Sequence, residues 1–500
     1  MKLGVMLLLL LAPLLSLVAL GRACLSPEEA YRFTGAVCRL TYPAALVLNE
    51  KTTRVIEAAF QHAKYPSIEG QKSMVVFGKV SYGLHNLEIH NLSIGHSEVK
   101  LHAGEGIGLL ISNVSAVFKG TLKYAYGSWL IRVAQTVDFE IESQIDLGIN
   151  PKLYCGAGKV AADTSDCFLT FHKLKLILQG DRAPGWLKRV FTDFVTFTVK
   201  MVIKGQICKE INNVANILAD FIQDQAGQFL SDGNITIDIG VTSAPVITSN
   251  YVESYHKGLT IYNGTKAVIN GSVFHPSQLT EDRMLYFWLS DDVFNPLIAA
   301  AHHEGRFIRN ISGAELMNLF KTDLSTEMPA SIKQILASET AVLTAWSVSV
   351  PQLWSVPDGT HVKAVAAVEL SPGFPSSDIP SLYFETEVEV SVQTSYADKK
   401  LILKATPVKI SIDKILQNQE TIVLDGALVN YLNEAVEKIG IPKVTSFLEP
   451  ALTDLMDMQG LNLFDIINPE VVTQNGYVLV RMGFGFPHHL LVEFLKKTLV

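Results

Sequence analysis

The residues that most enzymes use for catalysis do not occur in this chain at a productive spacing. No Gly-x-Ser-x-Gly segment is present to place a serine nucleophile on a sharp turn. His303 and Glu304 begin a zinc-protease motif, but Phe307 occupies the position that needs the second histidine. The glycines of residues 104–108 lack the dinucleotide-binding spacing, and no lysine follows a glycine loop as in a Walker A motif. We therefore expect a protein that is not an enzyme, with a dispersed esterase-like site as the alternative.

The five cysteines indicate a disulfide rather than a metal site. Cys167 and Cys208 flank about 41 residues that lead from a strand pattern to a helix pattern, and closing this loop would stabilise the fold by about 4 kcal/mol. Because the number is odd, at least one cysteine of a monomer has no partner, and Cys24, Cys38 and Cys155 stay unassigned. No Cys-x-x-Cys occurs, and His302-His303 has no second ligand pair, so we expect no metal.

Composition excludes several classes of protein. The 500 residues are 48% apolar and 18% charged, which suits two or three domains with large cores and excludes intrinsic disorder. The formal net charge of −8 leaves no excess of cations for phosphates, so a nucleic-acid partner is not expected. No run of 18 apolar residues follows the first 23, so we expect no transmembrane helix.

The N-terminus has the pattern of a secretory signal over residues 1–23. Lys2 precedes an apolar stretch that reaches Leu20, and Gly21 and Ala23 supply small residues before a cleavage site. The alternative is a bacterial lipoprotein lipidated at Cys24, although Gly21 stands where such signals prefer leucine. We predict a secreted, extracellular glycoprotein with six Asn-x-Ser/Thr sequons: Asn91, Asn113, Asn234, Asn263, Asn270 and Asn310. The two inside alternating strands, Asn91 and Asn113, should be too poorly exposed for glycosylation, and Asn263 and Asn270 are the better candidates.

Long strands of period two alternate with a few apolar helices, and this pattern appears twice. Residues 138–149 place apolar side chains on one face and acidic ones on the other, and residues 382–392 repeat this alternation. The same criterion predicts strands at 74–84, 111–124, 171–178, 235–241 and 401–412. Helical spacing predicts helices at 52–64, 186–204, 207–230, 425–439 and 443–458, with breaks near Gly205 and at Gly440-Ile441-Pro442.

These elements indicate an α+β protein of two similar halves, each a curved antiparallel sheet that holds helices. Residues 258–282 have the composition of a linker. Residues 486–500 form an amphipathic pattern in which Lys496 and Lys497 lie opposite an apolar arc that includes Leu490, Leu491, Phe494 and Leu495. Such a helix either docks on the core or acts as a lid that contacts lipid. Helices that are apolar nearly all round are consistent with either a lipid cavity or a tightly packed core.

Seven collinear segments resemble the lipid-transfer and lipopolysaccharide-binding family, which includes bactericidal/permeability-increasing protein. They run from residue 37 toward the C-terminus: Val37–Leu46, Tyr82–Leu87, Phe118–Tyr124, Pro184–Trp186, Lys204–Ile211, Arg283–Trp288 and Leu463–Glu470. The resemblance implies a boomerang of two barrels of twisted antiparallel sheet around helices, joined by a central sheet. The implied domains are an N-terminal barrel with its share of the central sheet over 24–257, the linker 258–282, a C-terminal barrel over 283–485 and the helix 486–500.

The resemblance also implies a long apolar tunnel that holds cholesteryl esters or triglyceride and is plugged by phospholipid. Gln223, Ser254 and His256 match polar positions that line this tunnel, although each is also explained as an ordinary polar side chain at the end of a helix or strand. Gln225 stands where the resembling sequences carry arginine, which removes a charged contact to a phospholipid head group. The family's disulfide falls on Cys167 and Cys208, and residues 490, 491, 494 and 495 match a mobile tunnel cover.

The function implied by the resemblance is exchange of cholesteryl esters and triglycerides between high-density, low-density and very-low-density lipoproteins by a monomer that touches lipid surfaces. Bound lipids would be the only cofactors. The alternative is a lipopolysaccharide-binding or phospholipid-transfer protein of the same fold. A lipopolysaccharide binder should carry a basic N-terminal tip, but residues 24–150 contain 11 Lys and Arg against 12 Asp and Glu. The count, together with the terminal helix, therefore argues against the lipopolysaccharide binder.

Overall fold

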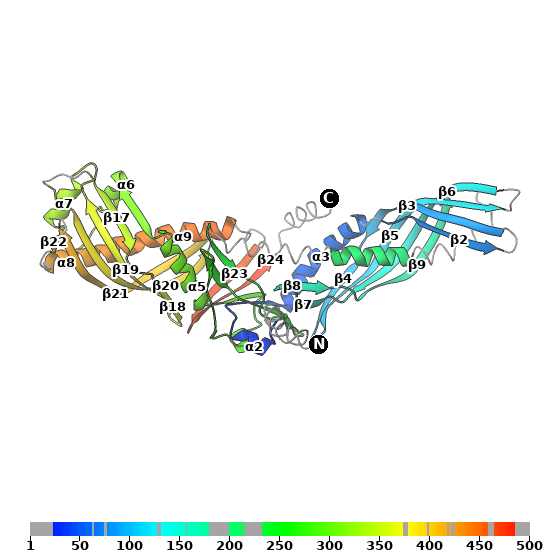
Figure 1. The fold of residues 1–500 in the computed structure, drawn as a ribbon, viewed down its shortest axis with the longest axis horizontal. Helices are drawn as coiled ribbons and strands as arrows, with labels where there is room; N and C mark the ends of the chain where they lie inside the picture. The colour runs from blue at the N-terminus through cyan, green and yellow to red at the C-terminus, as the bar shows by residue number, and fades with distance from the viewer. Residues whose placement is uncertain are drawn as a thin grey trace, which may run out of the picture.

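The molecule is an elongated pair of lobes joined through a central sheet, as Figure 1 shows for the computed structural model. The structure describes residues 24–62, 65–74, 78–127, 132–156, 158–179, 200–213, 216, 233–373, 379–397, 400–417, 420–421, 426–458 and 465–485. The predicted signal peptide and the predicted C-terminal helix lie outside these residues. Within them, the predicted α+β fold of two halves with antiparallel sheets around helices is confirmed.

The N-terminal lobe is a strongly curved antiparallel sheet with strand order β2-β3-β5-β6-β9, to which β4 adds beside β5. Its strands are long because apolar and polar residues alternate over most of their length; Phe139, Ile141 and Ile145 of β6 are at most 1% exposed. The bounds are β2 Ile68–Met74, β3 Gly78–Ser93, β4 His96–His102, β5 Gly106–Gly127, β6 Arg132–Ile149 and β9 Cys167–Gln179. A separate hairpin joins β7 (Lys152–Gly156) to β8 (Lys159–Asp163).

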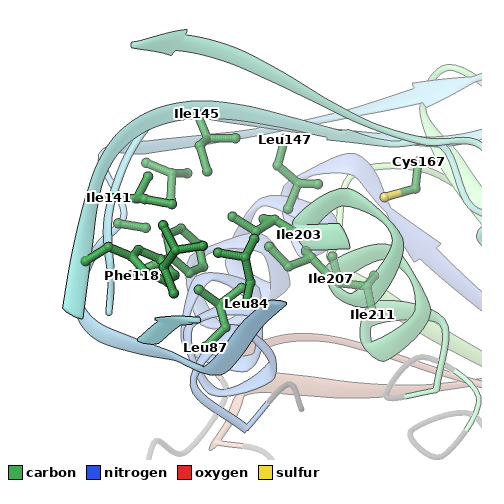
Figure 2. Packing of buried hydrophobic residues seen from close by; sticks show 14 of the residues in the cluster. Leu84, Leu87, Phe118, Ile141, Ile145, Leu147, Cys167, Ile203, Ile207 and Ile211 are labelled. Carbon is green, nitrogen blue, oxygen red and sulfur yellow. The ribbon is translucent and has the colours of Figure 1, made fainter. Parts of the chain in front are cut away.

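Two helices fill the curve of this sheet. Ile203, Ile207 and Ile211 repeat every four residues along the helix over 200–213 and enter the same core as Leu84 and Leu147 of the sheet (Figure 2). The second helix, α3 (Tyr42–His62), starts ten residues before the predicted 52–64. Proline is favoured in the first helical turn, and Pro43 marks the start that periodicity missed.

The central sheet is built from strands far apart in the sequence, in the order β11-β12-β1-β15-β24-β23. Their bounds are β1 Ala36–Thr41, β11 Val246–Ile247, β12 Tyr251–His256, β15 Leu285–Ser290, β23 Asp465–Gln474 and β24 Tyr477–Gly485. A small sheet of β10 (Ile235–Asp238), β13 (Leu259–Tyr262) and β14 (Thr265–Lys266) lies beside it, with α2 (Pro27–Tyr31) and the 3-10 turn η1 (Pro276–Gln278). Part of the predicted linker 258–282 is therefore in strands.

The C-terminal lobe repeats the design with strand order β16-β17-β19-β20-β21-β22 and with β18 beside β19. The strands are β16 Ile308–Ser312, β17 Val342–Ser347, β18 Gln352–Val356, β19 Gly359–Ser371, β20 Leu382–Ala397, β21 Lys400–Gln417 and β22 Glu420–Thr421. The helices are α5 Asp291–His303, α6 Gly313–Leu319, α7 Ala330–Leu336, α8 Gly426–Ala435 and α9 Ile441–Met458. Figure 1 shows α8 at the far end of this lobe and α9 running from it toward the centre.

Besides the start of α3, several predicted boundaries differ from the structure. The break expected near Gly205 is absent, because the helix is continuous over 200–213. The break expected at Gly440-Ile441-Pro442 is instead a π-helical turn, η2 (Val436–Gly440), which joins α8 to α9 without a loop. A widened turn accommodates a proline that cannot donate to the preceding turn. The strand predicted at 74–84 is divided between β2, which ends at Met74, and β3, which begins at Gly78, and the strand predicted at 235–241 ends at Asp238.

Candidate lipid-binding site

Ser254 and His256 project from the same face of strand β12 and form a hydrogen-bonded pair. Their Oγ and Nε2 atoms are 2.8 Å apart, and His256 Nδ1 lies 2.9 Å from the carbonyl oxygen of Ile239. Because a carbonyl only accepts, Nδ1 donates to Ile239, and Nε2 of the neutral ring accepts from the Ser254 hydroxyl. Burial lowers the pKa of His256, which favours this neutral form. The Ser254 oxygen keeps acceptor capacity toward a ligand.

Ser254 continues as a row of side chains across the central sheet. Register places Cys38 of β1 beside Ser254, Phe287 of β15 beside Cys38, and Val480 of β24 beside Phe287. All four side chains are half-buried rather than closed off. Apolar residues of α3 pack against the same face, as do Leu285 and Met482. We call this face, defined by Cys38, Ser254, Phe287 and Val480, the central apolar row.

The opposite face of the central sheet is sealed. Val37, Tyr255, Tyr286 and Trp288 are at most 1% exposed and share a core with Phe274 of the predicted linker. Successive residues of one strand point to opposite faces, whereas register partners on neighbouring strands point to the same face, so the register divides the sheet into one closed and one accessible side. Only the face with the central apolar row is available to a ligand in the part of the sheet that the structure describes.

The inner face of the C-terminal lobe extends this apolar surface. Val388, Val390 and Val392 of β20 are half-buried, and so are their partners Val362 and Ala364 on β19. β23 of the central sheet contacts β18, β19 and β20, so the central sheet meets the C-terminal lobe at this strand. Large apolar surfaces that stay accessible in a soluble lobe mark binding sites for apolar partners. The arrangement suits an extended, uncharged lipid.

Cys38 is the member of the row that sequence reasoning left without a role. It is free, and its thiol pKa is raised to about 12, first by burial and second by the carboxylate of Glu253. The thiol therefore stays protonated and unreactive at physiological pH. The alternation of side chains along residues 36–41 could have predicted this position, because it places Cys38 on the same, accessible face as Leu40.

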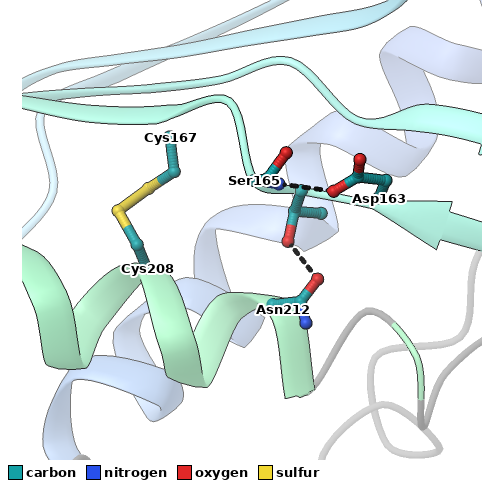
Figure 3. The surroundings of a disulfide bond; sticks show 6 residues. Asp163, Ser165, Cys167, Cys208 and Asn212 are labelled. Carbon is teal, nitrogen blue, oxygen red and sulfur yellow. Dashed lines mark hydrogen bonds between the residues drawn. A yellow bond between two sulfur atoms is a disulfide. The ribbon is translucent and has the colours of Figure 1, made fainter.

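The structure joins Cys167 to Cys208, the pair that their spacing favours. This bond ties β9 to the helix over 200–213 (Figure 3). The Thr164 hydroxyl donates to Asn212 Oδ1 at 2.6 Å. A second disulfide joins Cys24 to Cys155, which the sequence left unassigned. Both bonds anchor the N-terminal lobe.

The remaining predicted site residues fall into two groups. Gln223 lies outside the described residues. So do the four residues of the predicted tunnel cover, Leu490, Leu491, Phe494 and Leu495. All six sequon asparagines are exposed, so the expectation that Asn91 and Asn113 are poorly exposed was wrong. Asn91 and Asn113 each lie at a β-bulge, and the backbone of Asn113 is left-handed, with a φ of 57°. A bulge takes a side chain out of the strict alternation.

Metal centres and membrane-spanning helices are both absent from the residues that the structure describes. No cluster of three or more His, Cys, Asp or Glu side chains is placed to hold a metal ion among these residues. None of the helices within the described ranges is both long and apolar enough to cross a bilayer.

Two family models cover most of the chain. "LBP / BPI / CETP family, N-terminal domain" matches residues 46–261, and the C-terminal domain model of that family matches residues 230–474. Cholesteryl ester transfer protein of Gallus gallus is 44% identical over 492 residues, 97% of each chain. Its counterpart in Homo sapiens is 42% identical over 98% of this chain and 100% of its own length. Lipopolysaccharide-binding protein of Homo sapiens is 23% identical over 56% of this chain and 58% of its own.

Proposed function

The chain belongs to the LBP / BPI / CETP family, and from this premise we propose that it is a secreted protein that exchanges neutral lipids between plasma lipoproteins. Its cargo would be cholesteryl esters and triglycerides, with some phospholipid, and its partners would be high-density, low-density and very-low-density particles. The observation that carries the proposal is the central apolar row, on a sheet whose strand β23 meets the C-terminal lobe.

The physical task of such a protein is to shield cargo from water. A cholesteryl ester exposes several hundred Å² of apolar surface, at a cost of about 25 cal/mol per Å². Continuous contact with side chains such as Phe287 and Val480 removes most of that cost during transfer. No covalent bond is made or broken, which agrees with a family of lipid-binding and lipid-transfer proteins rather than enzymes.

In this proposal, polar groups beside the central apolar row bind the polar end of the lipid. Ser254 and His256 would contact the polar end of a lipid at the N-terminal side of the central sheet, together with Gln223. The helix predicted at 486–500 would cover the entrance through its apolar arc and open at a lipid surface. The chain would act as a monomer, with the six sequons kept away from the lipid path.

Identity of the cargo separates this proposal from its alternative. The identity with cholesteryl ester transfer proteins spans nearly the whole chain, whereas that with the lipopolysaccharide-binding protein is lower and covers about half. The test is lipid extraction and mass spectrometry of protein secreted by animal cells and purified without detergent. Cholesteryl ester or triglyceride beside phospholipid, at a few molecules per chain, is expected. Phospholipid alone would contradict neutral-lipid transfer and support the phospholipid or lipopolysaccharide carrier.

A matched functional assay follows from the same idea. Donor particles that contain a labelled cholesteryl ester are mixed with acceptor particles, and transfer is measured with and without the protein. Transfer should depend on protein concentration and should leave the ester bond intact. Accumulation of free cholesterol and fatty acid would instead support the esterase alternative, as would labelling by a serine-reactive phosphonate.

A further inference from the structure

The inner face of the C-terminal lobe closes at a defined level along its strands. On β20, Val392, Val390 and Val388 are half-buried, whereas Thr386 and the next inner residues toward the lobe's far end are at most 7% exposed. β21 shows the same change, from half-buried Ile410 to Ile412, which is 9% exposed. The accessible part of this face therefore stops at Thr386, and an apolar molecule that lies along it would have one end there.

Thr386 brings an unpaired hydroxyl to this closed end. It is 2% exposed, its Oγ1 has no hydrogen-bond partner, and its register neighbours Ala366 and Ile412 are apolar. Leaving a buried hydroxyl unpaired costs about 1–3 kcal/mol, so such groups normally have a partner. The geometry at the end of an open apolar face points to a ligand as that partner.

A second hydroxyl reaches the same core from the helical side. Tyr431 of α8 is 1% exposed, packs in the cluster that contains Phe384 and Ile412, and its hydroxyl also lacks a partner. Burial, and secondarily Glu434, raise the pKa of Tyr431 to about 12, so the group keeps its proton and can donate. The core at the closed end thus contains two unpaired hydroxyl groups that can donate a hydrogen bond.

We propose that the hydroxyls of Thr386 and Tyr431 donate hydrogen bonds to ester oxygens of a neutral lipid whose apolar body lies along the inner face of β19, β20 and β21. This inference rests on the proposed function and specifies where the C-terminal lobe recognises its cargo. An ester oxygen accepts hydrogen bonds without carrying charge. A phosphate at this depth would require a buried positive counter-charge, whereas the charged group that acts on Tyr431 is the negative carboxylate of Glu434.

A pair of lipids that differ only in the acceptor tests the proposal. Full-length protein is loaded with an equimolar mixture of cholesteryl oleate and cholesteryl oleyl ether, which lacks the carbonyl, and the retained lipids are measured by mass spectrometry. One hydrogen bond should enrich the ester about threefold to tenfold over the ether. Thr386→Val and Tyr431→Phe should each lower this ratio toward one, and Thr386→Ser should restore it.

Thr260→Val is the matched control. Thr260 of β13 also has a buried hydroxyl without a partner, but it lies in the small sheet beside the central one. This variant should keep the ester-to-ether ratio of the wild type. Equal retention of ester and ether by the wild type would overturn this inference while leaving neutral-lipid transfer intact, and so would an unchanged ratio in Thr386→Val. Failure of the wild type to take up either lipid would reject the proposed function and this inference with it.

Discussion

At the scale of single residues, burial controls the chemistry of the central apolar row. His256 has a pKa below its usual value near 6.5 because burial disfavours the charged ring. At mildly acidic pH, His256 is therefore protonated in the unfolded chain but stays neutral in the folded chain. Folding stability contributed by this group is present above about pH 6.5 and decreases as pH falls below that value.

Replacement of His256 by glutamine should remove this dependence. We expect the wild type to lose more stability than His256→Gln between pH 7.5 and pH 5, because only the wild type carries the buried titratable ring. Urea midpoints at the two pH values measure the difference. His172→Gln is a suitable control, since that ring pairs with Asp146 on the exposed surface. An identical pH response in wild type and His256→Gln would contradict the assignment.

Cys38 provides a second prediction at this scale. Its raised pKa and half-buried position should make it resist iodoacetamide in the folded protein at pH 8, because the thiolate is the nucleophile. After unfolding in urea without reductant, one thiol per chain should be alkylated, since the other four cysteines form two disulfides. Mass spectrometry counts the added groups. Rapid labelling of the folded chain, or three labelled thiols after unfolding, would refute this view.

At the scale of secondary-structure elements, one buried ion pair holds the predicted linker against the central sheet. Arg39 Nε lies 2.6 Å from Glu253 Oε2, and the two side chains are 3% and 1% exposed. The same guanidinium donates to the carbonyls of Leu279 and Pro276, and Tyr255 donates its hydroxyl to Glu253. Strands β1 and β12 are thereby connected to residues 276–280.

Removal of the arginine should be costly because it leaves the Glu253 carboxylate buried and unpaired. We expect Arg39→Ala to lower the free energy of unfolding by about 3–5 kcal/mol. The matched control is Lys363→Ala, whose pair with Glu387 spans 3.1 Å between partly exposed side chains. That change should cost less than about 1 kcal/mol. Urea unfolding followed by tryptophan fluorescence compares the two variants, and equal losses would argue against a structural role for the buried pair.

At the scale of the whole molecule, the central sheet determines whether the two lobes act on one ligand. Its accessible face joins the side of the N-terminal lobe that holds α3 to the C-terminal lobe through the central apolar row. A transfer protein needs this continuity, because a polar side chain in the path must be desolvated when the lipid covers it. A gap in the path would instead expose the lipid to water.

A polar side chain in the middle of the row tests this continuity. Phe287→Asn should slow transfer of a labelled cholesteryl ester about tenfold, since an unpaired amide against an apolar ligand costs about 1–3 kcal/mol. Val408→Asn is the control, because Val408 is 53% exposed on β21. It should transfer at the wild-type rate. Circular dichroism checks that both variants fold, and equal transfer by folded Phe287→Asn would contradict a lipid path along the row.

Sequence periodicity was sufficient for much of the fold because strand alternation is a local property. The faces of residues 138–149 and 382–392 follow from the residue types at each second position, and the structure buries the expected side of β6. The spacing of Cys167 and Cys208 likewise favoured the bond that the structure contains. Helix ends were predicted less accurately: α3 begins at Tyr42, ten residues earlier than expected, and a π turn replaces the expected break before α9.

The tertiary structure alone decided which distant segments meet. Strand β1 lies between β12 and β15, more than 200 residues later in the chain, and this pairing places Cys38 beside both Ser254 and Phe287. No local pattern determines such a register, because it depends on long-range pairing and on which face each strand buries. For the same reason the Cys24–Cys155 bond and the unpaired hydroxyl of Thr386 could not be read from composition or spacing. Sequence thus determined the elements and their apolar faces, whereas three-dimensional packing determined how those faces form a site.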